Sequence, residues 1–119
     1  MNGIDRTTTI TINNEEYNLV MTTAATREII ARFGGLEQIG DVIAAEGAGG
    51  LGELAWLIAL LSNQGIRQEN FINHAQKKEI TAEFVELFTT PADIAAMQGA
   101  LVEAMTKGSR RDVKSEQKN

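Results

Sequence analysis

Polar and apolar residues alternate near the start of the chain, where Thr7 to Ile12 reads Thr-Thr-Thr-Ile-Thr-Ile. A polar stretch from Asn13 to Glu16 follows, and Tyr17 to Met21 is again largely apolar. A period of two on either side of a polar break predicts a β-hairpin over residues 7–21. Two strands alone are marginal in water, so the hairpin is expected to pack on helices of its own chain or to join a sheet edge of another copy or a partner.

The period changes to that of a helix after the hairpin. Thr22 or Thr23 is a suitable N-terminal cap for a helix that ends at Phe33, where Gly34-Gly35 provides a stop that tolerates positive φ. A second short helix is predicted over residues 36–45, which makes the pair a helical hairpin. The expected apolar stripes are Ile29, Ile30 and Phe33 in the first helix and Leu36, Ile39, Val42 and Ile43 in the second.

Four glycines between residues 47 and 52 interrupt the helical pattern and predict a flexible joint. A phosphate-binding loop is the alternative, but it would need a preceding strand and a following lysine, and the pattern offers neither. Residues 51–63 are apolar on nearly every side, which predicts a buried central helix that ends at Gly65. Trp56 in this helix is either a core residue, which we favour, or an exposed interface anchor.

Residues 66–80 are mixed and polar, and they predict one or two helical turns around residues 69–76. Thr81 then caps a helix that bears Phe84, Leu87 and Phe88. Pro91 begins a last helix, since proline is best tolerated in a first turn, and that helix ends at Gly108. Its stripe is either a core face or a groove for a partner helix, which flexible methionines would suit, and it consists of Ile94, Met97, Leu101 and Met105.

These elements predict an α+β, mainly α fold, with a small N-terminal hairpin packed on a bundle of four to six helices. The length of 119 residues suits one domain over residues 1–108, with helices between about 23 and 107. Residues 109–119 hold a single apolar side chain among charges of both signs, so a disordered tail is expected there. Apolar residues make up 43% of the chain and aromatics only 5%, which favours helix packing over a sheet sandwich.

Charge and cysteine content narrow the classes of function. The chain has 11 basic and 16 acidic residues, a net charge of −5, and most of this surface would repel a phosphate backbone. We therefore expect no nucleic-acid partner. There is no cysteine, the N-terminus lacks a signal-peptide pattern, and the apolar run Leu54 to Leu61 is far short of the roughly 20 residues that cross a bilayer. A reducing cytoplasm and no membrane partner are expected.

No residue pattern indicates catalysis. His74 is the only histidine and lies in a polar segment, so a solvated surface residue is more plausible than a metal ligand. Neither serine-based nucleophile motifs nor phosphate loops are present, and carboxylate pairs such as Glu15-Glu16 or Glu83 and Glu86 are expected to face water. We predict a non-enzymatic interaction protein with no catalytic, cofactor-binding or metal-binding residues.

Two segments resemble a known family. Residues 31–40, Ala-Arg-Phe-Gly-Gly-Leu-Glu-Gln-Ile-Gly, follow the hairpin in the manner of tail assembly chaperones from long-tailed bacteriophages and their prophages. Residues 54–66 are similar to the apolar central helix of that family and its glycine stop. The resemblance covers roughly residues 10–66 through packing residues rather than chemical signatures, and the C-terminal half matches only in size and helical character.

The resemblance implies a protein of the host cytoplasm, absent from the finished virion, that coats the tape measure protein and helps recruit tail tube subunits. It also leaves self-association open. Alternatives are a structural phage protein, such as a head-tail connector or minor virion subunit, and a helical regulatory adaptor. Partner contacts are expected at the hairpin edge or at an apolar surface made by Trp56, Phe84, Phe88, Met97, Leu101 and Met105.

Overall fold

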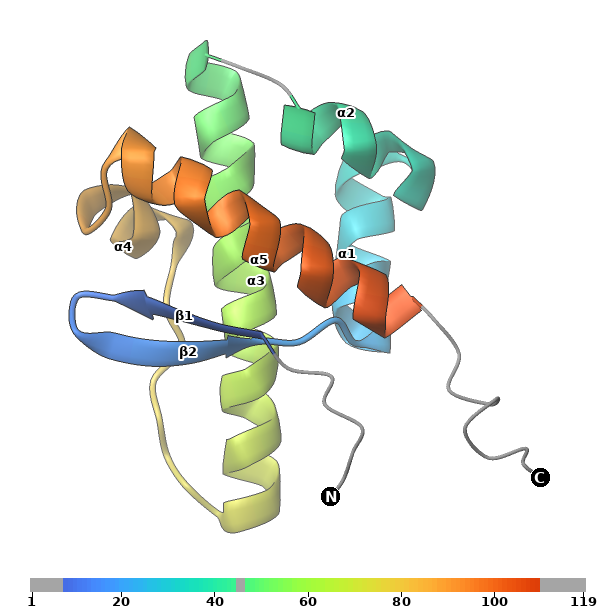
Figure 1. The fold of residues 1–119 in the computed structure, drawn as a ribbon. Helices are drawn as coiled ribbons and strands as arrows, with labels where there is room; N and C mark the ends of the chain where they lie inside the picture. The colour runs from blue at the N-terminus through green and yellow to red at the C-terminus, as the bar shows by residue number, and fades with distance from the viewer. Residues whose placement is uncertain (1–7, 45–46, 110–119) are drawn as a thin grey trace.

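A computed structural model describes residues 8–44 and 47–109, in which a hairpin is followed by helices (Figure 1). The predicted α+β, mainly α class is confirmed. The start of the predicted hairpin at Thr7 and the tail beyond Ser109 lie outside the described residues. Ser109 itself is the last residue of a helix, one position into the predicted tail.

The hairpin consists of β1 (Thr8–Ile12) and β2 (Glu15–Leu19), which pair antiparallel. Asn13 and Asn14 form a two-residue turn with φ of 54° and 66°, the left-handed pair that a type I′ turn requires. Asparagine tolerates this region better than most residues, so the turn is shorter than the polar stretch suggested. Glu15 and Glu16 are consequently strand residues rather than turn residues.

Helix α1 (Thr23–Phe33) begins and ends where the sequence predicts. The Thr22 hydroxyl accepts a hydrogen bond from the Ala25 amide at 3.0 Å, and Gly34 closes the helix with φ of 94°. The predicted stripe is wrong at one position, because Ile29 is fully buried whereas Ile30 is 44% exposed. Adjacent helical residues point about 100° apart, and one narrow face of α1 rests on the core.

The second predicted helix is divided into two short pieces. A 3₁₀ turn, η1 (Leu36–Gln38), leads directly into α2 (Ile39–Ala44). Ile39 is buried and Val42 and Ile43 are half-buried, as expected, but Leu36 is 38% exposed. Leu36 belongs to the tighter turn, where the register differs from that of an α-helix.

Helix α3 (Gly47–Asn73) is the central helix, and it is longer at both ends than the sequence suggests. The predicted flexible joint is wrong, because Gly49, Gly50 and Gly52 lie inside the helix and Gly47, with φ of 87°, is its first residue. The apolar residues that follow are buried, and this burial stabilises a helix that its glycine-rich first turns would not support alone. β2, α1, α2, α4 and α5 all contact α3.

Gly65 is not a helix stop but a contact point. A Cβ at this position would lie 2.7 Å from the Asn18 backbone oxygen, a distance that real Cβ atoms do not reach. Nearby, the Val20 amide donates to the Leu61 carbonyl at 3.2 Å. Glycine therefore lets the end of β2 approach the backbone of α3 closely.

Helix α3 ends at Asn73, and the next residue, His74, adopts φ of 56°. Residues 74–81, which we call the strap, then run back along α3 without regular secondary structure (Figure 1). The predicted turns around residues 69–76 are therefore correct only up to Asn73, and the rest of that range belongs to the strap.

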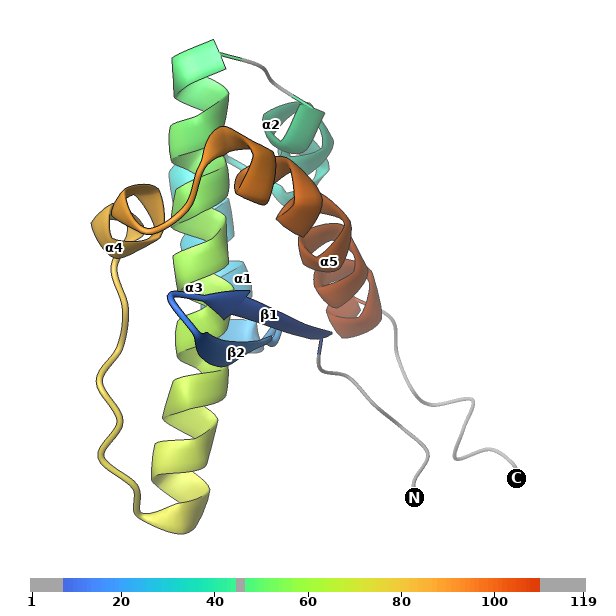
Figure 2. The same ribbon diagram turned by 60° about the vertical axis from the view of Figure 1, so that its left-hand side comes forward.

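Two more helices complete the fold. The Thr81 hydroxyl accepts from the Phe84 amide at 3.0 Å and caps α4 (Ala82–Leu87). Helix α5 (Pro91–Ser109) begins at the proline, where Thr90 and Asp93 exchange hydrogen bonds of 2.9 and 3.2 Å. Figures 1 and 2 together show α5 and the hairpin on one side of α3 and α4 on another.

One hydrophobic core joins the hairpin to the helices. Its largest fully buried apolar side chains come from the hairpin and from α1, α3, α4 and α5, namely Ile12, Leu19, Ile29, Leu57, Ile58, Leu61, Val85 and Leu101. Among the described residues, no helix combines the length and apolarity that crossing a membrane requires.

Candidate protein-interaction surface

Apolar side chains reach the surface where α4 turns into α5. Leu87 is 70% exposed and Phe88 is 50% exposed. The Phe88 ring lies 4.9 Å from that of Phe84, which in turn meets the Tyr17 ring edge-on at 6.4 Å. This row of aromatic rings runs from β2 to the α4–α5 turn, and Phe88 is its exposed end.

A groove of about 330 Å³ lies beside this end, between β1 and α5. We call it the β1–α5 groove. One side is lined by the five consecutive residues from Thr9 to Asn13. The helical side is lined by apolar and polar residues, namely Phe88, Thr89, Asp93, Ala96, Met97 and Ala100. Side chains alternate across a strand, so a lining of consecutive residues means that the groove follows the edge of β1.

The register of the hairpin shows which backbone groups face this groove. Ile12 pairs with Glu15 across a two-residue turn, which makes them a hydrogen-bonded pair, and the alternation gives the same role to Ile10. Thr9 and Thr11 therefore direct their backbone N–H and C=O groups away from β2. Within the described residues β1 pairs only with β2, so its outer edge offers backbone hydrogen bonds next to the Phe88 and Met97 side chains.

Trp56 lies on a different face, against α1. Its ring meets Phe33 edge-on with centroids 5.7 Å apart, and the Arg32 guanidinium lies 4.4 Å from its centroid. Arg32 also bonds Glu53 at 2.9 Å. These contacts leave Trp56 half-buried, between the two alternatives that the sequence allows.

The predicted partner-binding residues thus fall into three groups. Phe84, Phe88 and Met97 lie together around the β1–α5 groove, whereas Trp56 is apart from them. Leu101 is fully buried and Met105 is 8% exposed, which corrects their assignment to an accessible surface. The reason is that α5 turns the stripe containing them toward the core, which is the core-face alternative for this helix.

Two strongly exposed apolar residues of the described chain are not predicted from the sequence. Phe71 is 86% exposed and Ile72 is 70% exposed, both at the far end of α3. Their signal was a pair of large apolar residues in a polar segment. Because Gly65 predicts a helix end, the pattern assigns this pair to no helical face.

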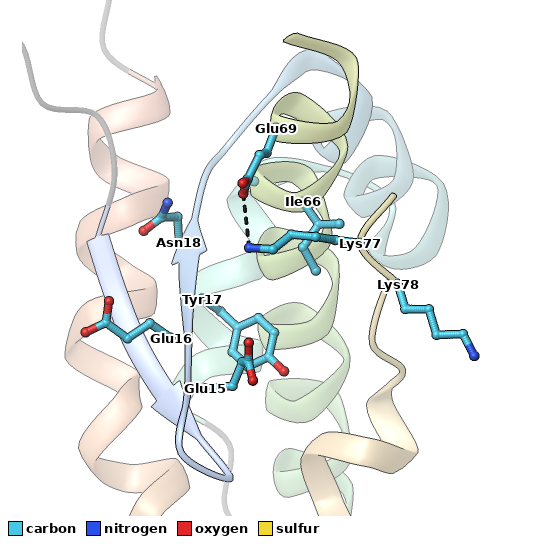
Figure 3. Close-up of a pocket in the computed structure, with 9 residues that line it drawn as sticks. Glu15, Glu16, Tyr17, Asn18, Ile66, Glu69, Lys77 and Lys78 are labelled. Atoms are coloured by element: carbon cyan, nitrogen blue, oxygen red, sulfur yellow. Dashed lines mark hydrogen bonds and ion pairs between the residues drawn. The ribbon is translucent and has the colours of Figure 1, made fainter. Parts of the chain in front are cut away.

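A polar pocket of about 270 Å³ lies between β2, α3 and the strap (Figure 3). Lys77 Nζ lies 3.1 Å from Glu69 Oε1 across it, near the Tyr17 ring. Partial burial raises the pKa of the Tyr17 hydroxyl, and the Glu15 carboxylate raises it further, while Lys77 opposes both. Tyr17 is therefore protonated at neutral pH, and the lysine is matched by a carboxylate.

His74 is exposed at the end of α3, as predicted for a solvated residue. In the part of the chain that the structure describes, no three histidine or acidic side chains gather as metal ligands would. The absence of enzymatic activity stays a prediction.

Comparisons with protein-family models, with curated proteins and with solved structures find no match to this chain.

Proposed function

We propose that this protein is a tail assembly chaperone that binds the tape measure protein in the host cytoplasm and helps recruit tail tube subunits. The proposal joins the resemblance in residues 10–66 to one structural observation. Phe88 and Met97 line the same groove as the outer edge of β1, so two predicted contact regions form one surface.

The chemistry of this groove supports a protein ligand. An open strand edge supplies backbone hydrogen bonds to an added segment, and apolar pockets beside it select side chains. The segment from Thr8 to Ile12 contains no charge or proline, the devices with which many proteins protect a sheet edge. An extended apolar segment of the tape measure protein would be covered here, while the acidic body of the chaperone would keep the complex dispersed.

The test is co-expression of the chain with the tape measure and tail tube proteins, followed by affinity purification. We expect the tape measure protein to become more soluble and to co-purify. Phe88→Asp should reduce the captured amount at least about tenfold, because it replaces an apolar ring with a second carboxylate beside Asp93 that a bound segment would have to desolvate. Phe71→Asp is the matched control, since it changes an exposed phenylalanine at the far end of α3.

Each outcome decides something. Unchanged solubility and no co-purification would reject the chaperone proposal. Loss of capture in Phe71→Asp alone would retain the function but move the contact surface to the tip of α3. Mass spectrometry of purified virions addresses the structural alternative, because a head-tail connector or minor subunit would remain in the particle.

A further inference from the structure

A second apolar groove lies on the other side of the α4–α5 turn from the β1–α5 groove. Two adjoining hollows of about 290 and 300 Å³ share Leu51, Pro91 and Ile94 as lining residues. We call them together the Leu51 groove. Leu51 is 37% exposed within it. The Leu51 groove meets the β1–α5 groove only at Thr89, so the two are separate surfaces.

The floor of the Leu51 groove is shaped by small residues on α3. Ala48, Gly52 and Ala55 line one hollow together with Leu51, at the spacing of a single helix face. A Cβ at Gly52 would meet only Glu86 Oε2, at an ordinary 3.8 Å, among the described residues. Packing within the described chain therefore does not require glycine at this position.

Gly65 is a position where packing within the described chain does require glycine. A Cβ there would collide with the Asn18 backbone, whereas a Cβ at Gly49 or Gly52 would not collide with any described atom. Glycine weakens a helix relative to alanine, so these two positions lower the stability of α3 without improving its own packing. Close approach of a second backbone is a physical use for such a glycine.

The charges around the Leu51 groove indicate what that second backbone carries. The sequence has no lysine or arginine from Phe33 to Ile66 or from Ile80 to Thr106. These stretches provide α2, the first turns of α3, α4 and most of α5, which form the groove. Of the carboxylates in these stretches, Glu53 is paired with Arg32 and Glu103 with Lys107. Glu86 is the single charged residue among the described residues that line the groove, so the lining carries a negative charge and favours a cationic ligand.

From the groove between helices, the unneeded glycine and the acidic surroundings, we infer that the Leu51 groove binds a basic amphipathic helix of a partner protein. The apolar ridge of that helix packs on the exposed Leu51 and Pro91, above the buried Ile94. Gly52 and its small neighbours let the backbones approach, and lysine or arginine residues beside the ridge meet Glu86. This site is independent of the β1–α5 groove and of the assignment to phage tails.

The probe is a fluorescein-labelled peptide of about 18 residues, with leucine and alanine on one helical face and lysine on the other. Its partner peptide has glutamate in place of lysine. Binding to the full-length protein is measured by fluorescence anisotropy near physiological salt. We expect the lysine peptide to bind and the glutamate peptide to bind at least about tenfold more weakly.

Two leucine variants separate the groove from the stability of the helix. Gly52→Leu fills the hollow and should lower the affinity for the lysine peptide at least about tenfold. Gly49 lies outside the lining, so Gly49→Leu should leave that affinity within about twofold of the value for the original chain. Both should melt at or above the original temperature by circular dichroism, because leucine is the better helix former. Glu86→Gln should flatten the dependence of binding on salt.

Several results would overturn the inference. Equal binding of the lysine peptide to Gly52→Leu would place it elsewhere on the acidic surface, and equal binding of both peptides would remove the charge argument. Loss of peptide binding in Phe88→Asp would assign the peptide to the β1–α5 groove. A dimer in sedimentation that Gly52→Leu converts to a monomer would make the groove a self-interface. Failure of tape measure capture would leave this inference standing.

Discussion

Two asparagines on α3 hold the strap through both polar atoms of their side-chain amides. Asn63 Nδ2 donates to the Ile80 carbonyl and Asn63 Oδ1 accepts from the Ile80 amide, both at 2.8 Å. Asn70 makes the same pair of bonds to Lys77, at 3.1 and 3.0 Å. Each side-chain amide takes the place of the peptide group of a neighbouring strand. The backbone N–H and C=O groups of Lys77 and Ile80 are therefore hydrogen-bonded although the strap belongs to no sheet.

Asn63→Ala should destabilise the protein more than Asn70→Ala. Asn63 is 9% exposed, and its loss leaves two backbone groups of the half-buried Ile80 without partners, at a cost of about 2–3 kcal/mol. The Asn70 bonds are exposed, and water can replace them at about 0.5–1 kcal/mol. Urea unfolding followed by Trp56 fluorescence measures both. Equal losses would mean that the strap is held by other contacts.

The ion pair between Arg67 and Glu79 lies between the Asn63–Ile80 and Asn70–Lys77 hydrogen bonds. Arg67 donates from Nε at 2.7 Å and from Nη2 at 3.0 Å to the two carboxylate oxygens. This hydrogen bonding raises the pKa of Arg67 and lowers the pKa of Glu79 below its ordinary 4.5. Both side chains are more than 40% exposed, so solvent weakens the pair.

Glu79 should make stability depend on pH in the acidic range. Its folded-state pKa is lower than its unfolded-state pKa, so the pair stabilises the fold above pH 4.5 and this stability is lost as the pH falls through the folded-state pKa. After allowance for exposure we expect about 0.2–1 kcal/mol. Urea unfolding at several pH values between neutral and acidic gives the free energy of unfolding of the original chain and of Glu79→Gln. A difference between the two free energies that does not change with pH would contradict the assignment.

At the scale of elements, helix ends follow local chemistry and helix lengths do not. Thr22, Thr81 and Pro91 stand at helix starts, and Gly34 closes α1, all as the sequence predicts. Each of these signals acts through a hydrogen bond or a backbone angle within a few residues. The extent of α3 is different, since it continues through glycines that would end an isolated helix.

Gly65→Ala and Gly49→Ala should have opposite effects on stability. Both replace a helical glycine, which favours α3 by up to about 1 kcal/mol. At Gly65 the new methyl group collides with the Asn18 backbone, which should cost about 1–3 kcal/mol and outweigh the gain. At Gly49 the methyl group finds open space among the described residues. The melting temperatures of the two variants are compared with that of the original chain. A higher melting temperature for Gly65→Ala would show that the hairpin can shift away from α3 to make room for the methyl group.

At the scale of the whole molecule, the hairpin connects α3 to α5. β2 approaches α3 at Gly65, and β1 lies beside α5 along the groove that carries the proposed function (Figure 2). The end of α5 also contacts the chain just after β2. A Cβ at Gly108 would overlap the Met21 side chain, so glycine allows this contact. The groove therefore exists only when strand and helix are both in place.

Leu101→Ala tests the core position of the α5 stripe. Removal of this fully buried side chain should cost about 2–5 kcal/mol, whereas Val102→Ala on the 43% exposed side should change stability by less than about 0.5 kcal/mol. Chemical denaturation of both variants provides the comparison. A small effect of Leu101→Ala would restore the alternative in which the stripe is open to a partner.

The sequence by itself determined the fold class, the hairpin, the capped helix starts and the central position of α3. Those signals are local, because capping bonds, turn angles and the period of burial act within a few residues of one another. The tertiary structure alone decided that Gly65 is a contact point, that the glycines of residues 47–52 are helical, and that the strap follows α3.

The candidate surface divides in the same way. Phe88 and Met97 could be named from their positions on two helices, and Leu101 and Met105 could be named equally well. Only the packing of α5 against α3 and β1 separates the exposed members from the buried ones. Burial depends on contacts between residues far apart in the chain, and the periodicity of one helix shows that a stripe exists but not which neighbour covers it.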